Sequence, residues 1–235
     1  GTILYNYSHR LKYLSYFSFN RKYGETFIAY NPEFQDLKIN ISQTTMADGK
    51  LVKAPGNAFN EVLPSYAANA PAFNHLREMV VTHTALEKNS IVDLDYTITN
   101  KSESLPALMG SENISSSSPV KNFQIIVKIP KDKLLKYELL NDTLNPKIEA
   151  IENYTLYKWE FKNVSADVHE LLQSDKTHPK LLFSTANSEE VFSDFVSQEA
   201  FSYNIGESEK KWVRKNTGLY KDEFQYIKTI QKAVV

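Results

Sequence analysis

The chain has 235 residues, with 27 lysine and arginine residues against 28 aspartate and glutamate residues. This length allows a sizeable hydrophobic core. Because the charges nearly cancel, no strong positive field draws the chain to nucleic acid or anionic lipid, and we expect no nucleic-acid partner. The chain has no cysteine, which excludes thiol nucleophiles, disulfides and cysteine-ligated zinc. No apolar run reaches the roughly 18 residues of a membrane span.

The first thirty residues show the two-residue periodicity that is typical of β-strands. Aromatic side chains alternate through residues 3–19, and residues 25–30 (ETFIAY) form a second apolar run. Residues 20–24, which separate the two runs, carry turn-forming side chains. The pattern therefore predicts two strands joined by a turn.

A third strand is predicted from the alternation of Leu37, Ile39 and Ile41 with polar residues, which is typical of a half-buried strand with one wet face. Asp48-Gly49 follows, and this pair tolerates the positive φ angles of tight hairpin turns. We therefore expect a hairpin here, with the return strand beginning at residue 51.

Residues 55–73 form an apolar segment that shows neither the helical nor the strand period, and its prolines argue against a regular strand. Leaving so much apolar surface in water is unfavourable. The segment is therefore expected to pack on its own domain or to cover a neighbour. Its large apolar side chains are Phe59, Val62, Leu63, Tyr66 and Phe73.

Residues 77–84 and 90–99 give the clearest hairpin pattern in the chain. A turn near Lys88 would place His83 opposite Asp93, near enough for a hydrogen bond between imidazole and carboxylate. This pair has two interpretations: an acid/base pair or half of a metal site, or a polar cross-strand pair on a solvated face. The second is favoured, because no third ligand or nucleophile stands at a recognisable spacing.

Four further strands are predicted by alternation, at residues 123–129, 137–140, 155–162 and 181–184. In the third of these, Tyr157, Trp159 and Phe161 form the inner face. Many short strands separated by turns predict a mainly β fold, an antiparallel β-sandwich with a short helical C-terminal section.

Helical signals are confined to the end of the chain. Asn187 is a candidate N-cap for a helix that reaches about residue 198, and apolar residues recur at helical spacing from residue 221 onward. No residue that stops a helix follows before Val235. We therefore expect the full protein to continue beyond this point.

Sequence motifs for catalysis are missing from the chain. It has no Gly-x-Ser-x-Gly elbow, no phosphate-binding glycine loop and no His-Glu-x-x-His helix. We therefore predict no catalytic residue, no cofactor site and no metal site.

Three stretches resemble a bacterial domain of unknown function, DUF3857. They are YNPEFQDLKINISQTTMADGKLVKAPGNAFNEVLP, AANAPAFNHLREMVVTHT and SSPVKNFQIIVKIP, and the resemblance spans about residues 5–164. Such domains precede a transglutaminase-like, cysteine-protease-type core in secreted or periplasmic bacterial proteins. The resemblance therefore implies a periplasmic or extracellular accessory domain whose partner is a downstream core of the same chain. Because that core acts through a cysteine, no catalytic residue transfers to this chain.

Combined with the periodicity, the resemblance predicts three parts. Residues 1–164 form the sandwich, residues 165–206 add a last strand and a short helix, and residues 207–235 form linker helices leading to a core that lies outside this chain. The module is expected to position that core or its substrate. An alternative is a glycan- or peptide-binding module that acts through exposed aromatic side chains. The predicted docking or binding residues are Phe59, Tyr66, Phe73, Phe224, Ile227 and Ile230.

Overall fold

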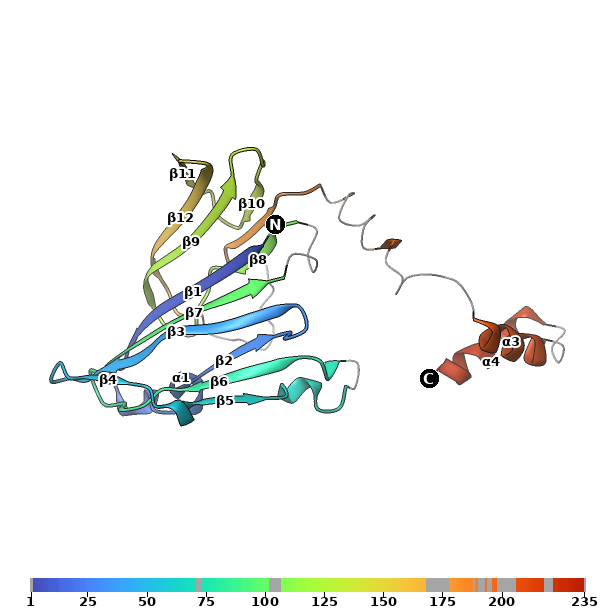
Figure 1. The fold of residues 1–235 in the computed structure, drawn as a ribbon, viewed down its shortest axis with the longest axis horizontal. Helices are drawn as coiled ribbons and strands as arrows, with labels where there is room; N and C mark the ends of the chain where they lie inside the picture. The colour runs from blue at the N-terminus through green and yellow to red at the C-terminus, as the bar shows by residue number, and fades with distance from the viewer. Residues whose placement is uncertain are drawn as a thin grey trace. The chain divides into compact units, whose positions relative to one another are not determined.

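The structure is a computed structural model, and its chain divides into two compact units, Gly1–Thr185 and Ala186–Val235. The first unit is built mainly of antiparallel strands, and short helices occur in the second (Figure 1). The predicted mainly β, antiparallel fold class is therefore confirmed. The residues that the structure describes are 2–70, 73–101, 107–167, 178–187, 189, 193, 196–197, 206–217 and 222–234.

Two sheets form the first sheet pair, and each is named here for a central strand. The β7 sheet has the order β1-β7-β3-β4 and the β6 sheet has the order β2-β6-β5. Ile28, Val81 and Leu94 are buried between them and form their common core. The strands are β1 Ile3–Lys12, β2 Glu25–Tyr30, β3 Gln35–Thr45, β4 Leu51–Lys53, β5 Phe59–Val62, β6 Arg77–Thr82 and β7 Ile91–Asn100.

The second sheet pair follows in the chain and has a core of its own. It consists of the β12 sheet, with the order β11-β12-β9, and the β13 sheet, with the order β10-β13-β8. Trp159 and Leu181 are fully buried between these two sheets. The strands are β8 Met109–Asn113, β9 Val120–Pro130, β10 Lys136–Leu140, β11 Lys147–Ile151, β12 Tyr154–Val164 and β13 Lys180–Ser184.

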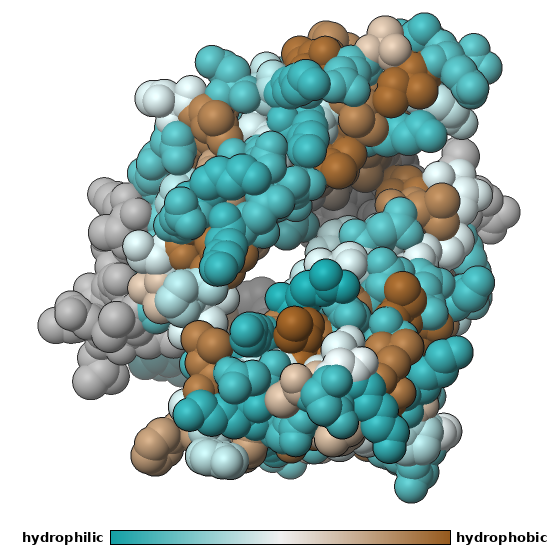
Figure 2. All heavy atoms as spheres, turned by 90° about the vertical axis from the view of Figure 1, so that its left-hand side faces the viewer, coloured by the Kyte–Doolittle hydropathy of each residue, from teal (hydrophilic) through white to brown (hydrophobic). Residues whose placement is uncertain are grey.

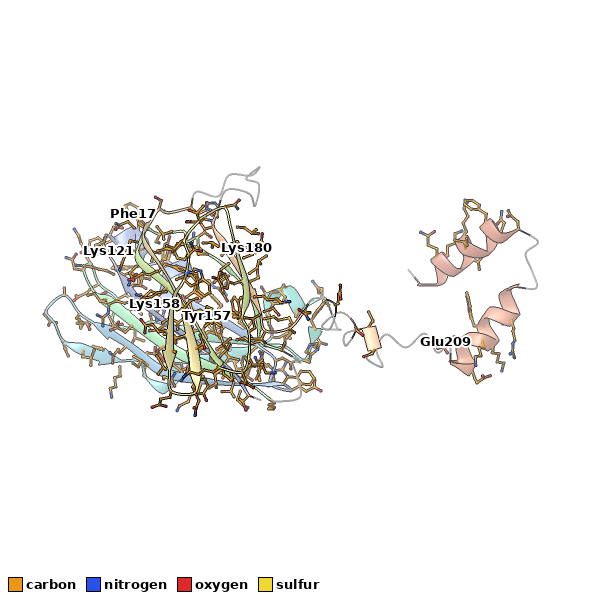
Figure 3. The ribbon with its side chains drawn as sticks, turned by 90° about the horizontal axis from the view of Figure 1, so that it is seen from above. Phe17, Lys121, Tyr157, Lys158, Lys180 and Glu209 are labelled. Atoms are coloured by element: carbon orange, nitrogen blue, oxygen red, sulfur yellow. The ribbon has the colours of Figure 1, made fainter. Side chains whose placement is uncertain are left out.

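Strand β12 illustrates why the alternating pattern predicts the core. Tyr157, Trp159 and Phe161 are buried, whereas Lys158 and Glu160 between them are half-buried and exposed, respectively. Tyr157 and Lys158 are labelled on this strand in Figure 3. Successive side chains of a strand point to opposite faces, so one sequence pattern supplies both a core and a wet surface. The predicted inner face of this strand is confirmed.

The predicted hairpin at Asp48-Gly49 is also confirmed. Strands β3 and β4 pair from Gln43 with Lys53 to Thr45 with Leu51. Gly49 has a φ of 89°, a left-handed conformation that glycine adopts without a steric penalty. The Asp48 carboxylate accepts a hydrogen bond of 2.8 Å from the backbone N–H of Lys50 and so closes the turn.

The first strand is shorter than predicted. Strand β1 ends at Lys12, which pairs with Ile91, the first residue of β7, and beyond this point the partner strand ends. The chain then forms a 3-10 helix, η1 Tyr16–Ser18, and the short helix α1 Arg21–Gly24. Asn20 caps α1 by accepting a hydrogen bond from the backbone of Lys22, so the aromatic alternation past Lys12 does not mark a strand.

A β-bulge corrects the prediction for Ile41. The pairing of β3 with β7 shifts register between Ile39 and Ile41. Ile41 is therefore placed opposite Asp95, on the outer face, and is exposed. The bulged residue, Asn40, donates hydrogen bonds to Asp95 and Thr97 at 2.7 and 2.9 Å.

The apolar segment 55–73 is more regular than predicted. It contains β5, which pairs with β6 from Phe59 with Val81 to Val62 with Glu78. Two further 3-10 helices, η2 Gly56–Ala58 and η3 Ser65–Ala67, follow Pro55 and Pro64. The prolines flank the strand and do not interrupt it, and β5 is an edge strand, which is where prolines are tolerated.

The predicted hairpin of residues 77–84 and 90–99 is wrong. Both segments form strands, but β6 pairs with β2 and β5, whereas β7 pairs with β1 and β3. The connection between β6 and β7 therefore leads from the β6 sheet to the β7 sheet, which lies on the other side of the common core. Two consecutive strands with matching alternation therefore face each other as layers and do not pair side by side.

The described part of the second unit consists mainly of α3 Glu207–Thr217 and α4 Glu223–Val234. The helix predicted from Asn187 to about residue 198 lies largely outside the described residues. None of the helices in the described part of the chain has the length and apolar character to span a membrane.

Replacing Trp159 with alanine is expected to destabilise the first unit by about 3–5 kcal/mol, because the side chain is fully buried and leaves a cavity. Ile126→Ala on the outer face of β9, where the side chain is 53% exposed, is the matched control and should change stability by less than about 0.5 kcal/mol. Urea unfolding followed by far-UV circular dichroism, a signal that reports on the backbone, measures the stability of both variants. Equal losses in the two variants would contradict this assignment of the core.

Candidate functional site

Two aromatic side chains stand out from the surface between β5 and β6. Tyr66 is 63% exposed and Phe73 is 51% exposed. Because Val62, the last residue of β5, pairs with Glu78, this connection lies at the end of the β6 sheet that also holds Tyr30. We call Tyr66 and Phe73 together the aromatic surface.

Arg77 organises the turn that carries Phe73. Its guanidinium donates hydrogen bonds of 2.8 Å to the backbone carbonyls of Asn74 and Leu76. The backbone N–H of Leu76 in turn donates to the carbonyl of Phe73 at 3.0 Å. The aromatic surface is therefore presented on a hydrogen-bonded turn.

The other predicted docking residues have different positions. Phe59 is partly buried and packs against the core of the first sheet pair, so it supports the fold and does not form a surface. Phe224 and Ile227 of α4 are 61% and 56% exposed. Ile230 also belongs to α4, but its side chain lies outside the described part. A docking role for the exposed residues stays a prediction.

The structure does not bring His83 and Asp93 together. Asp93 lies on the outer face of β7, where Arg10 of β1 forms an ion pair with it at 2.6 Å. His83 is buried beside β2 and makes a hydrogen bond of 2.9 Å with Thr26. The predicted pair is therefore wrong, because β6 and β7 belong to different sheets.

His83 instead packs against His9 of β1, with ring centroids 6.1 Å apart. Burial is the main cause that lowers the pKa of His83 to about 4, and the neighbouring His9 lowers it further. Burial also lowers the pKa of His9, against an opposing effect of Asp93. Both imidazoles are therefore neutral at pH 7.

His9 begins a row of aromatic side chains on the inner face of the β7 sheet. Its Nδ1 lies 3.3 Å from the hydroxyl of Tyr7, and the Tyr7 ring stacks on Tyr96 with centroids 5.0 Å apart. Tyr5 shares this face, two residues before Tyr7 on the same strand. Tyr5 and Tyr7 are 41% and 36% exposed, so the row is open to solvent.

Glu112 of β8 approaches this row from the second sheet pair. Its carboxylate helps to raise the pKa of Tyr5 to about 12, an effect in which burial comes first, and it contributes in the same way at Tyr96. Figure 2 shows a hollow between the upper and lower parts of the molecule, at the height of β1 and β7 in Figure 1. We call the groups Tyr5, Tyr7, His9, Tyr96 and Glu112 the tyrosine cleft.

The described residues contain no candidate metal site. Among them, no three histidine, aspartate or glutamate side chains come together as a metal site requires. The groups of the tyrosine cleft can donate and accept hydrogen bonds, and its rings can stack on a ligand. The cleft therefore has the chemistry of a binding site.

Sequence reasoning missed the tyrosine cleft, although one signal was present. Tyr5, Tyr7 and His9 stand at alternating positions where an ordinary core strand carries aliphatic residues. Such amphipathic rings on an inward face indicate a partly wet interior. The sequence around Glu112 gives no comparable signal, because Glu112 and β1 lie far apart in the chain and only the fold brings them together.

A family model for a domain of unknown function, DUF3857, matches residues 18–167. The chain belongs to the DUF3857 family. The match contains strands β2 to β12, whereas β1 and β13 lie outside the matched residues. Comparison with curated proteins gave no match.

One solved structure is similar to the whole chain. It is the crystal structure of a protein from Parabacteroides distasonis described as a "putative protease", with 33% sequence identity and a TM-score of 0.89. The similarity covers 100% of this chain and 46% of the Parabacteroides distasonis protein. The chain therefore spans about half the length of that relative.

The stability of this DUF3857 domain is expected to fall as the pH decreases from 7 to 5. His83 binds a proton in the unfolded chain near pH 6.5 but in the folded domain only near pH 4. The contribution of His83 to stability is thus fully present above pH 6.5 and is lost as the pH falls towards 4. The loss at pH 5 is about 2 kcal/mol. Urea unfolding at several pH values should show a smaller loss in His83→Gln. An unchanged pH dependence in that variant would contradict the prediction.

Proposed function

We propose that this DUF3857 domain is a non-catalytic, N-terminal module of a larger cell-envelope protein, in which it positions a transglutaminase-like, cysteine-protease-type core or its substrate. The observation that carries this proposal is the similarity of the whole chain to 46% of a larger protein described as a protease. An accessory role is supported by the composition, since a chain without cysteine cannot supply the nucleophile of such a core.

The aromatic surface is the proposed contact with the transglutaminase-like core. Tyr66 and Phe73 leave large rings in water, and Arg77 holds the turn that presents one of them. Aromatic side chains that are exposed on an ordered turn lose little conformational entropy when a partner covers them. They are also enriched among the residues that dominate binding energies at interfaces.

Helix α4 supplies the second proposed contact. Phe224 and Ile227 lie three residues apart, so they share one side of the helix, and both are exposed. An apolar stripe of this kind is normally covered by another element. The proposed periplasmic or extracellular location and the transglutaminase-like nature of the partner rest on the family resemblance.

The alternative function is binding of a glycan or a peptide through the same aromatic side chains. The exposure of Tyr66 and Phe73 favours this alternative as well, because burial in the core of the domain would have excluded it. The two functions differ in what covers the rings, a domain of the same protein or a separate ligand.

The double variant Tyr66→Ser/Phe73→Ser tests the docking role in the full-length gene product. Removing the two rings from a packed interface is expected to lower the melting temperature of the core by several degrees and to speed its cleavage in limited proteolysis. Phe17→Ser is the matched control. Its ring is 93% exposed and precedes β2, at the opposite end of the β6 sheet.

Three outcomes of this experiment are distinguishable. If the double variant destabilises the transglutaminase-like core and Phe17→Ser does not, docking through the aromatic surface is supported. An unchanged core together with lost binding to an immobilised peptide or glycan library supports the alternative function. Equal effects of the double variant and Phe17→Ser would show that the aromatic surface has no specific role.

A further inference from the structure

The tyrosine cleft contains a carboxylate at a position where the strand pattern calls for an apolar residue. Glu112 pairs with Leu181, which is fully buried in the core of the second sheet pair. Directly opposite residues of paired strands project to the same face. Glu112 therefore lies on the inward parity of β8, between Gly110 and the buried Ile114.

Glu112 has no ion-pair partner in the described part of the chain. Its carboxylate interacts electrostatically with the phenols of Tyr5 on β1 and Tyr96 on β7. Tyr7 stacks on Tyr96, and the His9 imidazole lies beside Tyr7. Burial raises the pKa of Glu112, as expected for a carboxylate that has lost water without gaining a cation. Maintaining such a group is unfavourable for folding alone.

We propose that the tyrosine cleft binds an alkylammonium group, such as a lysine side chain or the amino terminus of a peptide. Glu112 supplies the counter-charge, and the exposed rings of Tyr5 and Tyr7 supply the π faces that attract cations. Phenol oxygens of the same residues can accept hydrogen bonds from the ammonium N–H groups. The inference concerns the cleft alone and does not depend on the docking role of the aromatic surface.

The charge of the cleft favours a cation over other ligands. His9 and His83 are neutral at pH 7 because burial lowers the pKa of each, so Glu112 supplies the formal charge of the cleft. An anionic ligand would be repelled by this carboxylate. A neutral saccharide could stack on the same rings, but it would leave the carboxylate without a counter-charge.

Titration of the 235-residue chain with n-hexylammonium and with Nα-acetyl-lysine methylamide, followed by calorimetry or by NMR, tests the proposal. Both probes should bind, whereas 1-hexanol and the Nε-acetylated lysine derivative should not. Glu112→Gln should weaken binding of the cations by about tenfold or more. Glu138→Gln should leave it unchanged, because Glu138 is an exposed carboxylate on β10 of the same sheet.

Two further variants separate stacking from simple charge attraction. Tyr7→Phe should keep cation binding because the π face remains, whereas Tyr7→Leu should weaken it severalfold. Affinity should also fall as the pH is lowered and Glu112 takes up a proton, and this dependence should vanish in Glu112→Gln. Thermal unfolding of each variant confirms that it is folded.

The proposal is overturned if neither cation binds, if 1-hexanol binds as tightly as n-hexylammonium, or if Glu112→Gln has the affinity of the parent chain. Binding of a neutral oligosaccharide that Glu112→Gln leaves unchanged, without binding of the cations, would assign the cleft to carbohydrate instead.

Discussion

The first sheet pair depends on the strict separation of the two faces of β7. Val92 and Leu94 are fully buried under the β6 sheet, while Asp93 and Asp95 on the opposite face bind Arg10 and Asn40. A slip of one residue against either neighbouring strand would bury both carboxylates and expose the apolar side chains, which makes the register of the sheet unambiguous. Because β1 and β3 both pair with β7, this one strand also determines which side chains of β1 face the interior. The register of β7 therefore also determines the position of the tyrosine cleft.

Local patterns predicted the elements of the fold better than their pairing. The alternation around Trp159 and the turn at Asp48-Gly49 depend on neighbouring residues only, and both predictions are confirmed. The bulge at Asn40 could not be read from the alternation, because it arises where a side-chain amide finds partners on another strand. Strand β5 was likewise hidden, since its four residues become regular only when β6 lies beside them. Pairing partners are chosen by long-range burial, which a single sequence does not display.

For the candidate sites, too, local patterns were predicted better than long-range contacts. The apolar segment that carries Tyr66 and Phe73 is conspicuous in the sequence, but only the structure separates these exposed rings from Phe59, which belongs to the core. The pair of His83 with a carboxylate failed because it assumed that consecutive strands are neighbours in one sheet. In a sandwich, consecutive strands often cross between layers, and residues that such a crossing brings together come from strands far apart in the chain. Glu112 meets the tyrosines of β1 and β7 in this way.

The prolines around β5 have a consequence for the behaviour of the protein at high concentration. An edge strand exposes backbone groups that can recruit a strand from another molecule, and long regular edges therefore promote aggregation. The β6 sheet ends in a strand of four residues, and Pro55 and Pro64 interrupt the backbone donors just outside it. The β7 sheet ends in β4, which has only three residues. The edges formed by β5 and β4 are thus too short to template an intermolecular sheet, so in this sheet pair the risk of edge-to-edge association is confined to the opposite edges, formed by β2 and β1.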